Sequence, residues 1–266
     1  MDNLRMVMLL AGGVLSGGSA ARAPEQLPAG NNGTHAASQL PAAIDPPPPS
    51  VQPGFYATQG GWGQLRIAPA AGTTGSRFRL ETGNSGYGCS MSGTVQNAGG
   101  TALVDREGRA AACALTLRSA QGNITLDTAS NAACNAYCGN NGSFKGTYHR
   151  ILEACAPHNV DRTRQHSRAL LARGAHLEAV QVLEPVFLHC LDTLAFVDAG
   201  GVRLDVAVAR HLSGDDAGCL AALQPYAADT QRSDDELTDG MSPAVADDFI
   251  AIIAAARDSL ARCRAE

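Results

Sequence analysis

The sequence predicts a two-domain α+β protein, in which an antiparallel β-barrel or sandwich is followed by an α-helical hairpin-repeat domain. Three observations support this prediction. Apolar residues alternate with period two from Gly54 to Tyr148, and their spacing changes to that of helices after Arg150. The eight cysteines also divide equally, four before residue 151 and four after it. Two separately cross-linked domains, at 54–150 and 151–266, follow from these patterns.

The first residues, 1–21, are expected to be a secretory signal peptide. Arg5 supplies a basic start, Met6–Leu15 is an apolar run of ten residues, and small residues follow. This run is about half of the ~20 residues that a membrane-spanning helix needs. We therefore expect a periplasmic or secreted protein with no membrane span, cleaved after Ala20 or Ala21.

Residues 22–53 are expected to be a disordered linker. This segment carries eight prolines, including Pro46–Pro49, and few large apolar residues. Such a composition cannot bury a core and favours extended polyproline-II geometry. The linker therefore tethers the folded part without a fold of its own.

The first domain contains short stretches of alternating residues separated by turns rich in Gly and Asn. Leu65 and Ile67 alternate with arginine in Q-L-R-I, and Phe78 and Leu80 do so in R-F-R-L. About seven or eight such strands fit into this domain, which favours an antiparallel sandwich or barrel with one buried face. Trp62, the only tryptophan, is expected in the core because the strand after it is amphipathic. An exposed binding aromatic is the alternative.

The four cysteines of this domain are expected to form disulfide bonds. Cys134 and Cys138 stand four positions apart, whereas a redox C-x-x-C has two intervening residues and a helical setting. A zinc site with Cys89 and Cys113 would have four ligands but no paired C-x-x-C knuckles. An oxidising compartment favours disulfides. The sequence leaves all three pairings open.

Lys145, the only lysine, follows a G-N-N-G turn in S-F-K-G-T-Y. Phe144, Gly146 and Tyr148 alternate as a closing strand, so Lys145, and Ser143 with it, are expected to point outward. Ser143, Lys145 and Trp62 are therefore the candidate partner-binding residues.

Two stretches of the second half align at a spacing of forty residues, A-L-L-A-R-G-A-H-L-E-A-V-Q-V-L-E-P from Ala169 and A-R-H-L-S-G-D-D-A-G-C-L-A-A-L-Q-P from Ala209. Each predicts the end of one helix, a glycine turn, a second helix and an end marked by proline. The segment G-A-H-L-E-A-V-Q-V-L-E-P resembles the turn and second helix of a tetratricopeptide-type repeat. The resemblance covers residues 159–227 and implies stacked helical hairpins that bind protein. The whole layout resembles uncharacterised exported proteobacterial proteins with a Cys-rich β-domain.

Four more cysteines fit these hairpins. Cys155 precedes the first helix and Cys190 ends the second, and these points are neighbours in an antiparallel hairpin. Cys219 and Cys263 are similarly placed to pin a last helix, Pro243–Arg262, as the cap of the stack. We therefore predict the bonds Cys155–Cys190 and Cys219–Cys263, with a loop from Thr230 to Ser242.

Charge differs between the halves, within a net charge of −5. Residues 54–150 contain eight Arg and Lys against four Asp and Glu, and residues 151–266 contain ten against eighteen. A mildly basic domain and an acidic one do not indicate nucleic-acid binding.

No catalytic signature is found, neither G-x-S-x-G, H-E-x-x-H, a P-loop nor G-x-G-x-x-G. No cofactor and no metal are therefore expected. The leading hypothesis is an exported, non-enzymatic protein-binding protein, with an inhibitor- or immunity-like action of Lys145 on a cell-wall hydrolase as its specific form. The alternative is a repeat-based adaptor of an envelope or secretion assembly.

Overall fold

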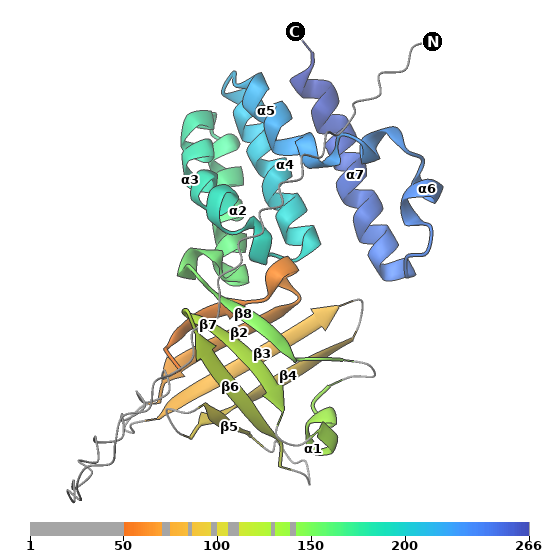
Figure 1. Ribbon diagram of the computed structural model, residues 1–266. Coiled ribbons are helices and arrows are strands. Elements are labelled where there is room, and N and C mark those ends of the chain that lie inside the picture. The colour runs from red at the N-terminus through yellow and green to blue at the C-terminus, as the bar shows by residue number, and fades with distance from the viewer. Residues whose placement is uncertain are drawn as a thin grey trace, which may run out of the picture. The chain divides into compact units, whose positions relative to one another are not determined.

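The structure, a computed structural model, describes residues 51–70, 75–84, 87–96, 100–105, 112–128, 131–138 and 142–265 (Figure 1). The expected signal peptide and the linker up to residue 50 lie outside these residues. The described residues belong to one compact unit, Pro46–Glu266.

The first half is a closed, eight-stranded antiparallel β-barrel, so the two-domain α+β prediction is confirmed and the sandwich alternative is wrong. Each strand pairs with the next along the chain, and β1 pairs with β8, with Tyr56 opposite Arg150, to close the barrel. The strands are β1 (Gly54–Ala57), β2 (Gly63–Pro69), β3 (Ser76–Asn84), β4 (Tyr87–Val95), β5 (Thr101–Val104), β6 (Ala114–Ala120), β7 (Asn123–Thr128) and β8 (Gly146–Ile151).

The barrel interior is filled by side chains. Alternate residues point to opposite faces of a strand, so Leu65 and Ile67 on β2 are buried while Arg66 is exposed. An eight-stranded barrel is just wide enough for side chains to fill it. The largest side chains with less than 2% exposure here are Tyr56, Leu65, Leu80, Met91, Leu115, Leu117, Ile124, Leu126 and Tyr148.

The second half is helical, and a short helix also stands between β7 and β8. The α-helices are α1 (Asn131–Asn135), α2 (Pro157–Leu171), α3 (His176–His189), α4 (Phe196–Leu212), α5 (Asp216–Leu223), α6 (Asp234–Thr238) and α7 (Pro243–Cys263). Short 3-10 helices are η1 (Gln59–Gly61), η2 (Glu153–Cys155), η3 (Leu191–Thr193), η4 (Gln224–Tyr226) and η5 (Asp229–Gln231). Helix α2 packs on α3, α4 packs on α5, and α7 packs on both α4 and α5 (Figure 1).

The glycines that match at a spacing of forty residues have one structural role. Gly174 and Gly214, with φ of 77° and 85°, follow α2 and α4 and turn the chain into the next helix. This left-handed conformation strains any residue with a Cβ, which explains why glycine stands at both positions.

The prolines of the two aligned stretches do not both mark the end of a helix. Pro225 follows α5, as expected, but Pro185 lies inside α3, which continues to His189. The prediction of a helix end at Pro185 is therefore wrong. Leu183 and Val186 on either side of it are buried in the helical core, and this packing outweighs the missing backbone N–H.

The segment Thr230–Ser242 is not a plain loop, contrary to the prediction. It contains most of η5 and the whole of α6, whose first turn is the acidic run Asp234–Glu236. Acidic side chains in a first helical turn are favoured by the helix dipole, so this run begins a helix within the expected loop.

All eight cysteines lie within the described residues and are paired. In the helical half Cys155 bonds to Cys190 and Cys219 to Cys263, the pairs that the sequence favours. In the barrel, Cys89 bonds to Cys138 and Cys113 to Cys134. The neighbouring Cys134 and Cys138 therefore do not bridge each other.

Candidate functional site

The segment that precedes β8 presents two of the candidate residues to solvent. Ser143 and Lys145 are exposed, whereas Phe144 between them is 4% exposed and packs in the barrel core. The buried hydroxyl of Tyr148 donates a hydrogen bond to the Phe144 carbonyl oxygen at 2.7 Å. The segment is thus anchored by its central residue and shows the side chains on either side of it.

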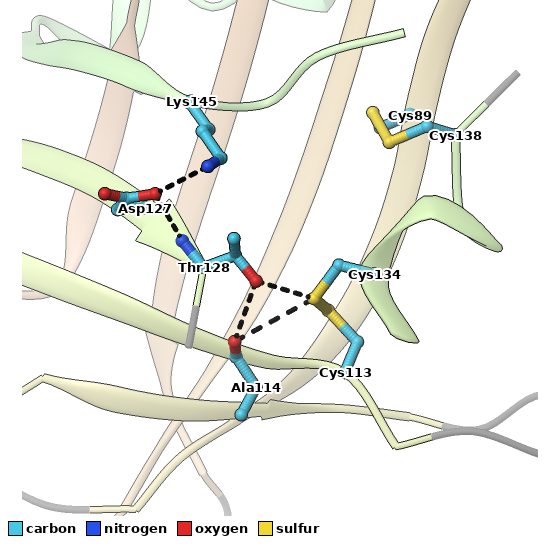
Figure 2. The surroundings of a disulfide bond; sticks show 8 residues. All are labelled: Cys89, Cys113, Ala114, Asp127, Thr128, Cys134, Cys138 and Lys145. Carbon is cyan, nitrogen blue, oxygen red and sulfur yellow. Dashed lines mark hydrogen bonds and ion pairs between the residues drawn. A yellow bond between two sulfur atoms is a disulfide. The ribbon is translucent and has the colours of Figure 1, made fainter. Parts of the chain in front are cut away.

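Lys145 is paired with a carboxylate of the neighbouring strand. Its Nζ lies 3.1 Å from Oδ1 of Asp127 on β7 (Figure 2). The backbone N–H of Thr128 donates to Asp127 at 2.7 Å, and this bond together with Lys145 lowers the pKa of the Asp127 carboxyl. Both side chains remain accessible to solvent, so the pair is an exposed one. We call Ser143, Lys145 and Asp127 the Lys145 face.

Two disulfide bonds clasp the connection between β7 and β8 to the barrel wall (Figure 2). Cys134, on α1, bonds to Cys113 next to β6, and Cys138 bonds to Cys89 on β4. The Thr128 hydroxyl donates to Cys134 Sγ at 3.1 Å. The predicted G-N-N-G turn falls at residues 139–142, of which 139–141 lie outside the described residues.

Trp62 is half-buried and does not share the Lys145 face. Its ring packs edge-on to Tyr148, at 6.1 Å between ring centroids. A Cβ added to Gly146 would lie 3.1 Å from the Trp62 ring. The ring therefore covers the inner face of β8 at Gly146. Lys145 points to the opposite, outer side with Asp127. The structure therefore brings Ser143 and Lys145 together and leaves Trp62, which follows η1, on the inner side of β8.

A cavity of about 310 Å³ lies where β2 and β3 meet the start of α2. Arg66, in its lining, lies over the Phe55 ring at 5.2 Å, which is a cation–π contact. Arg79 beside it pairs with Glu81 on the same strand. The cavity is therefore lined by the Arg66 guanidinium, which lies on the Phe55 ring, and by the Arg79–Glu81 ion pair, whose charges neutralise each other.

A second surface, which the sequence analysis did not single out, lies at the start of α4 and α7. Phe196 and Val197 are 40% and 42% exposed, although both are apolar and open a helix. The Phe196 ring lies 5.2 Å from that of Phe249 on α7 and edge-on to Tyr226 at 6.4 Å. The sequence contained one signal for this surface, because two apolar residues stand in the first turn of a helix, where polar residues are usual. We call Phe196, Val197 and Phe249 the α4–α7 patch.

Carboxylates stand beside this patch. Asp198 follows Val197 in the chain, and burial together with the nearby charge of Asp161 raises the pKa of its carboxyl, against the effect of Arg164. Arg164 is itself bonded to Asp205, with Nε 2.6 Å from Oδ2. Its positive charge is therefore already shared when it faces Asp161 and Asp198.

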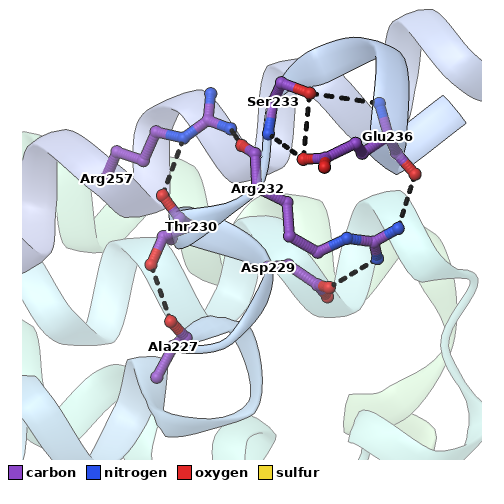
Figure 3. A network of polar contacts seen from close by, with 7 residues as sticks. All are labelled: Ala227, Asp229, Thr230, Arg232, Ser233, Glu236 and Arg257. Carbon is purple, nitrogen blue, oxygen red and sulfur yellow. Dashed lines mark hydrogen bonds and ion pairs between the residues drawn. The ribbon is translucent and has the colours of Figure 1, made fainter.

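A polar network holds α7 in place (Figure 3). Arg257 on α7 donates to the carbonyl oxygens of Thr230 and Arg232, which precede α6. Ser233 caps α6 by accepting from the Glu236 N–H, and the Glu236 carboxylate accepts from the Ser233 N–H at 2.9 Å. The backbone N–H and the hydroxyl of Ser233 both donate to the Glu236 carboxylate and lower the pKa of Glu236. The segment between α5 and α6 is thereby attached to α7 at Arg257.

Within the part of the chain that the structure describes, no three His, Cys, Asp or Glu side chains are grouped to hold a metal ion. No helix among the described residues is long and apolar enough to cross a membrane.

No protein-family model, no curated protein and no solved structure matches this chain.

Proposed function

We propose that this chain is an exported, non-enzymatic binding protein whose barrel contacts a partner protein through the Lys145 face. The observation that carries the proposal is the fixed presentation of Ser143 and Lys145. Phe144 anchors the segment in the core, and two disulfides hold the connection that leads to it. A segment that is ordered before binding loses little conformational entropy when it binds.

Four disulfide bonds suggest an oxidising environment. A periplasmic or secreted location agrees with this environment and with the expected signal peptide. Cell-wall hydrolases act in the same compartment, and many glycoside hydrolases cleave with two carboxylates in an open cleft. A lysine on a rigid tip is complementary to such a cleft. The proposed mode is therefore inhibition of, or immunity to, a muramidase.

Asp127 competes with any such partner for the Lys145 ammonium. Exposed ion pairs are weak because water screens them and two side chains must be ordered. A desolvated carboxylate in a partner cleft can therefore replace Asp127 at small cost. Removing the Asp127 charge should leave Lys145 free and strengthen binding, whereas removing Lys145 should weaken it.

The test measures inhibition of a purified muramidase by the full chain and its variants. We expect Lys145→Ala to weaken inhibition by at least about tenfold and Asp127→Asn to preserve or strengthen it. Arg66→Ala removes the same charge from the outer face of β2 and should have no effect. Inhibition that survives Lys145→Ala, or no inhibition by the unaltered chain, would overturn the inhibitor mode.

A second candidate function is favoured by the α4–α7 patch. Exposed apolar side chains gathered in one place mark interaction sites in soluble proteins, and helical-hairpin stacks offer extended binding surfaces. This observation supports an adaptor role for the helical half in an envelope or secretion assembly.

A further inference from the structure

The α4–α7 patch is a preformed surface. One turn beyond Phe196, a Cβ added to Gly200 would lie 2.9 Å from the side chain of Ile252, so α4 and α7 are in close contact there. Phe249 precedes Ile252 by one turn on the same side of α7. The two aromatic rings are therefore held by the packed helices beneath them, and Phe196 is presented without rearrangement.

Carboxylates outnumber cationic side chains beside the patch, where Arg164 acts on Asp198 and Arg203 acts on Tyr226. The negative charge of Asp161 helps to raise the pKa of the Asp198 carboxyl, and Arg164, which opposes this effect, is bonded to Asp205. Asp247 and Asp248 immediately precede Phe249, and no ion pair to either is found among the described residues. A cation placed here would relieve the repulsion between Asp161 and Asp198.

We propose that the α4–α7 patch binds a basic, extended segment of a partner protein. An apolar side chain of that segment contacts Phe196 and Val197, and its lysine or arginine side chains contact Asp161 and Asp198. This inference rests on the adaptor function proposed above and gives its partner a chemistry.

Other occupants fit the surface less well. In a symmetric dimer through this patch the same carboxylates would face each other, because a two-fold interface pairs a surface with itself. An acidic ligand would have to approach Asp198, which already occupies the positive N-terminal end of α4. A basic segment meets neither obstacle.

The test uses the full chain and a short synthetic peptide of alternating lysine and leucine, with binding followed by fluorescence anisotropy. A lysine–serine peptide keeps the charge without the apolar side chains, and a glutamate–leucine peptide reverses the charge. We expect the lysine–leucine peptide to bind at least about tenfold more tightly than either. Its affinity should also fall as salt is raised.

Variants of the chain locate the site. Phe196→Ser and the double change Asp161→Asn with Asp198→Asn should each weaken the peptide at least about tenfold. Val197→Ser is a second variant should Phe196→Ser fail to fold, as judged by circular dichroism. Leu188→Ser, at a leucine of α3 that is 61% exposed, is the matched control and should bind normally.

The outcomes separate the inference from the function beneath it. Equal binding by the chain with and without Phe196→Ser and Val197→Ser places the peptide elsewhere on the chain and overturns the site, but not peptide binding by the protein. Absence of binding by all three peptides overturns both the site and its basic partner. Tighter binding by a chain lacking residues 1–50 would make the protein's own N-terminal segment the occupant, and concentration-dependent dimers lost on Phe196→Ser would make it a second copy. Either result overturns the proposal.

Discussion

The barrel and the helical half each contain two disulfide bonds, but the bonds do different things in the two. In the barrel, every strand already pairs with both neighbours, and both bonds attach the single connection between β7 and β8 to the wall. In the helical half no hydrogen-bond ladder links one helix to the next, and the bonds join η2 to the end of α3 and the middle of α5 to the end of α7. The barrel disulfides therefore hold a surface segment, whereas the helical ones hold the architecture.

Two glycines show a related contrast between the rigid strands of the barrel and the more adaptable contacts between helices. A Cβ added to Gly93 on β4 would lie 2.0 Å from the Leu103 carbonyl oxygen of β5, whose position is fixed by the sheet. A Cβ added to Gly201 on α4 would lie 2.1 Å from Nη2 of Arg164, the end of a flexible side chain. Crowding at Gly93 meets backbone, and crowding at Gly201 meets a group that can move.

The largest effect is expected from removing one bond from each half. The loops closed by Cys89–Cys138 and Cys219–Cys263 span 49 and 44 residues, and each bond should contribute about 4 kcal/mol by the chain-entropy relation. We expect that replacing both cysteines of either pair by alanine lowers the free energy of unfolding by this amount, as measured by denaturant unfolding. The two variants should also differ in which residues lose protection from hydrogen exchange.

In the variant without Cys89–Cys138, loss of protection beyond the global loss of stability should be confined to residues 131–145, because the strand ladder remains. In the variant without Cys219–Cys263, α7 should lose protection along its length. A protected α7 in the second variant would show that packing alone holds the cap, and the contrast between the halves would fail.

A smaller effect is expected from the same substitution at two glycines. Gly93→Ala should destabilise by about 3 kcal/mol, because the added methyl group forces backbone apart. Gly201→Ala should cost about 1 kcal/mol, since Arg164 can move aside at the expense of its bond to Asp205, and alanine regains helix propensity. Thermal or denaturant unfolding of both variants checks the order. Equal losses would mean that the space beside Arg164 is as rigid as the sheet.

The sequence anticipated what depends on local pattern. Period-two alternation in Q-L-R-I and R-F-R-L located strands of the barrel, and helix-end positions located Cys155, Cys190, Cys219 and Cys263 as two pairs. Closure could not be foreseen in this way, because sandwich and barrel strands alternate alike. What closes the barrel is the pairing of Tyr56 with Arg150, which are far apart in the sequence.

In the candidate sites too, local pattern predicted some features and contacts between distant residues decided the rest. Alternation around Phe144 was enough to place Ser143 and Lys145 outside, but the partner of Lys145, Asp127, lies on another strand. The α4–α7 patch depends on Phe196 meeting Phe249 across two helices, and helical periodicity does not say which turn of a helix stays uncovered.

The smallest effect is expected at α6, where a local signal was present and misread. S-D-D-E is the capping box that starts the helix, and Ser233→Ala should destabilise by about 1 kcal/mol. The bonds from Ser233 lower the pKa of Glu236 below its ordinary 4.5, so their contribution is present above that pH and is lost as pH falls through the lowered pKa. Ser242→Ala is the matched control, because Ser242 precedes α7 without a side-chain cap bond. Unfolding measured against pH should therefore show a stability loss for Ser233→Ala that shrinks in acid and little loss at any pH for Ser242→Ala. A Ser233→Ala loss that stays constant down to strongly acidic pH would mean that the bond from the Ser233 hydroxyl to the Glu236 carboxylate does not contribute to stability.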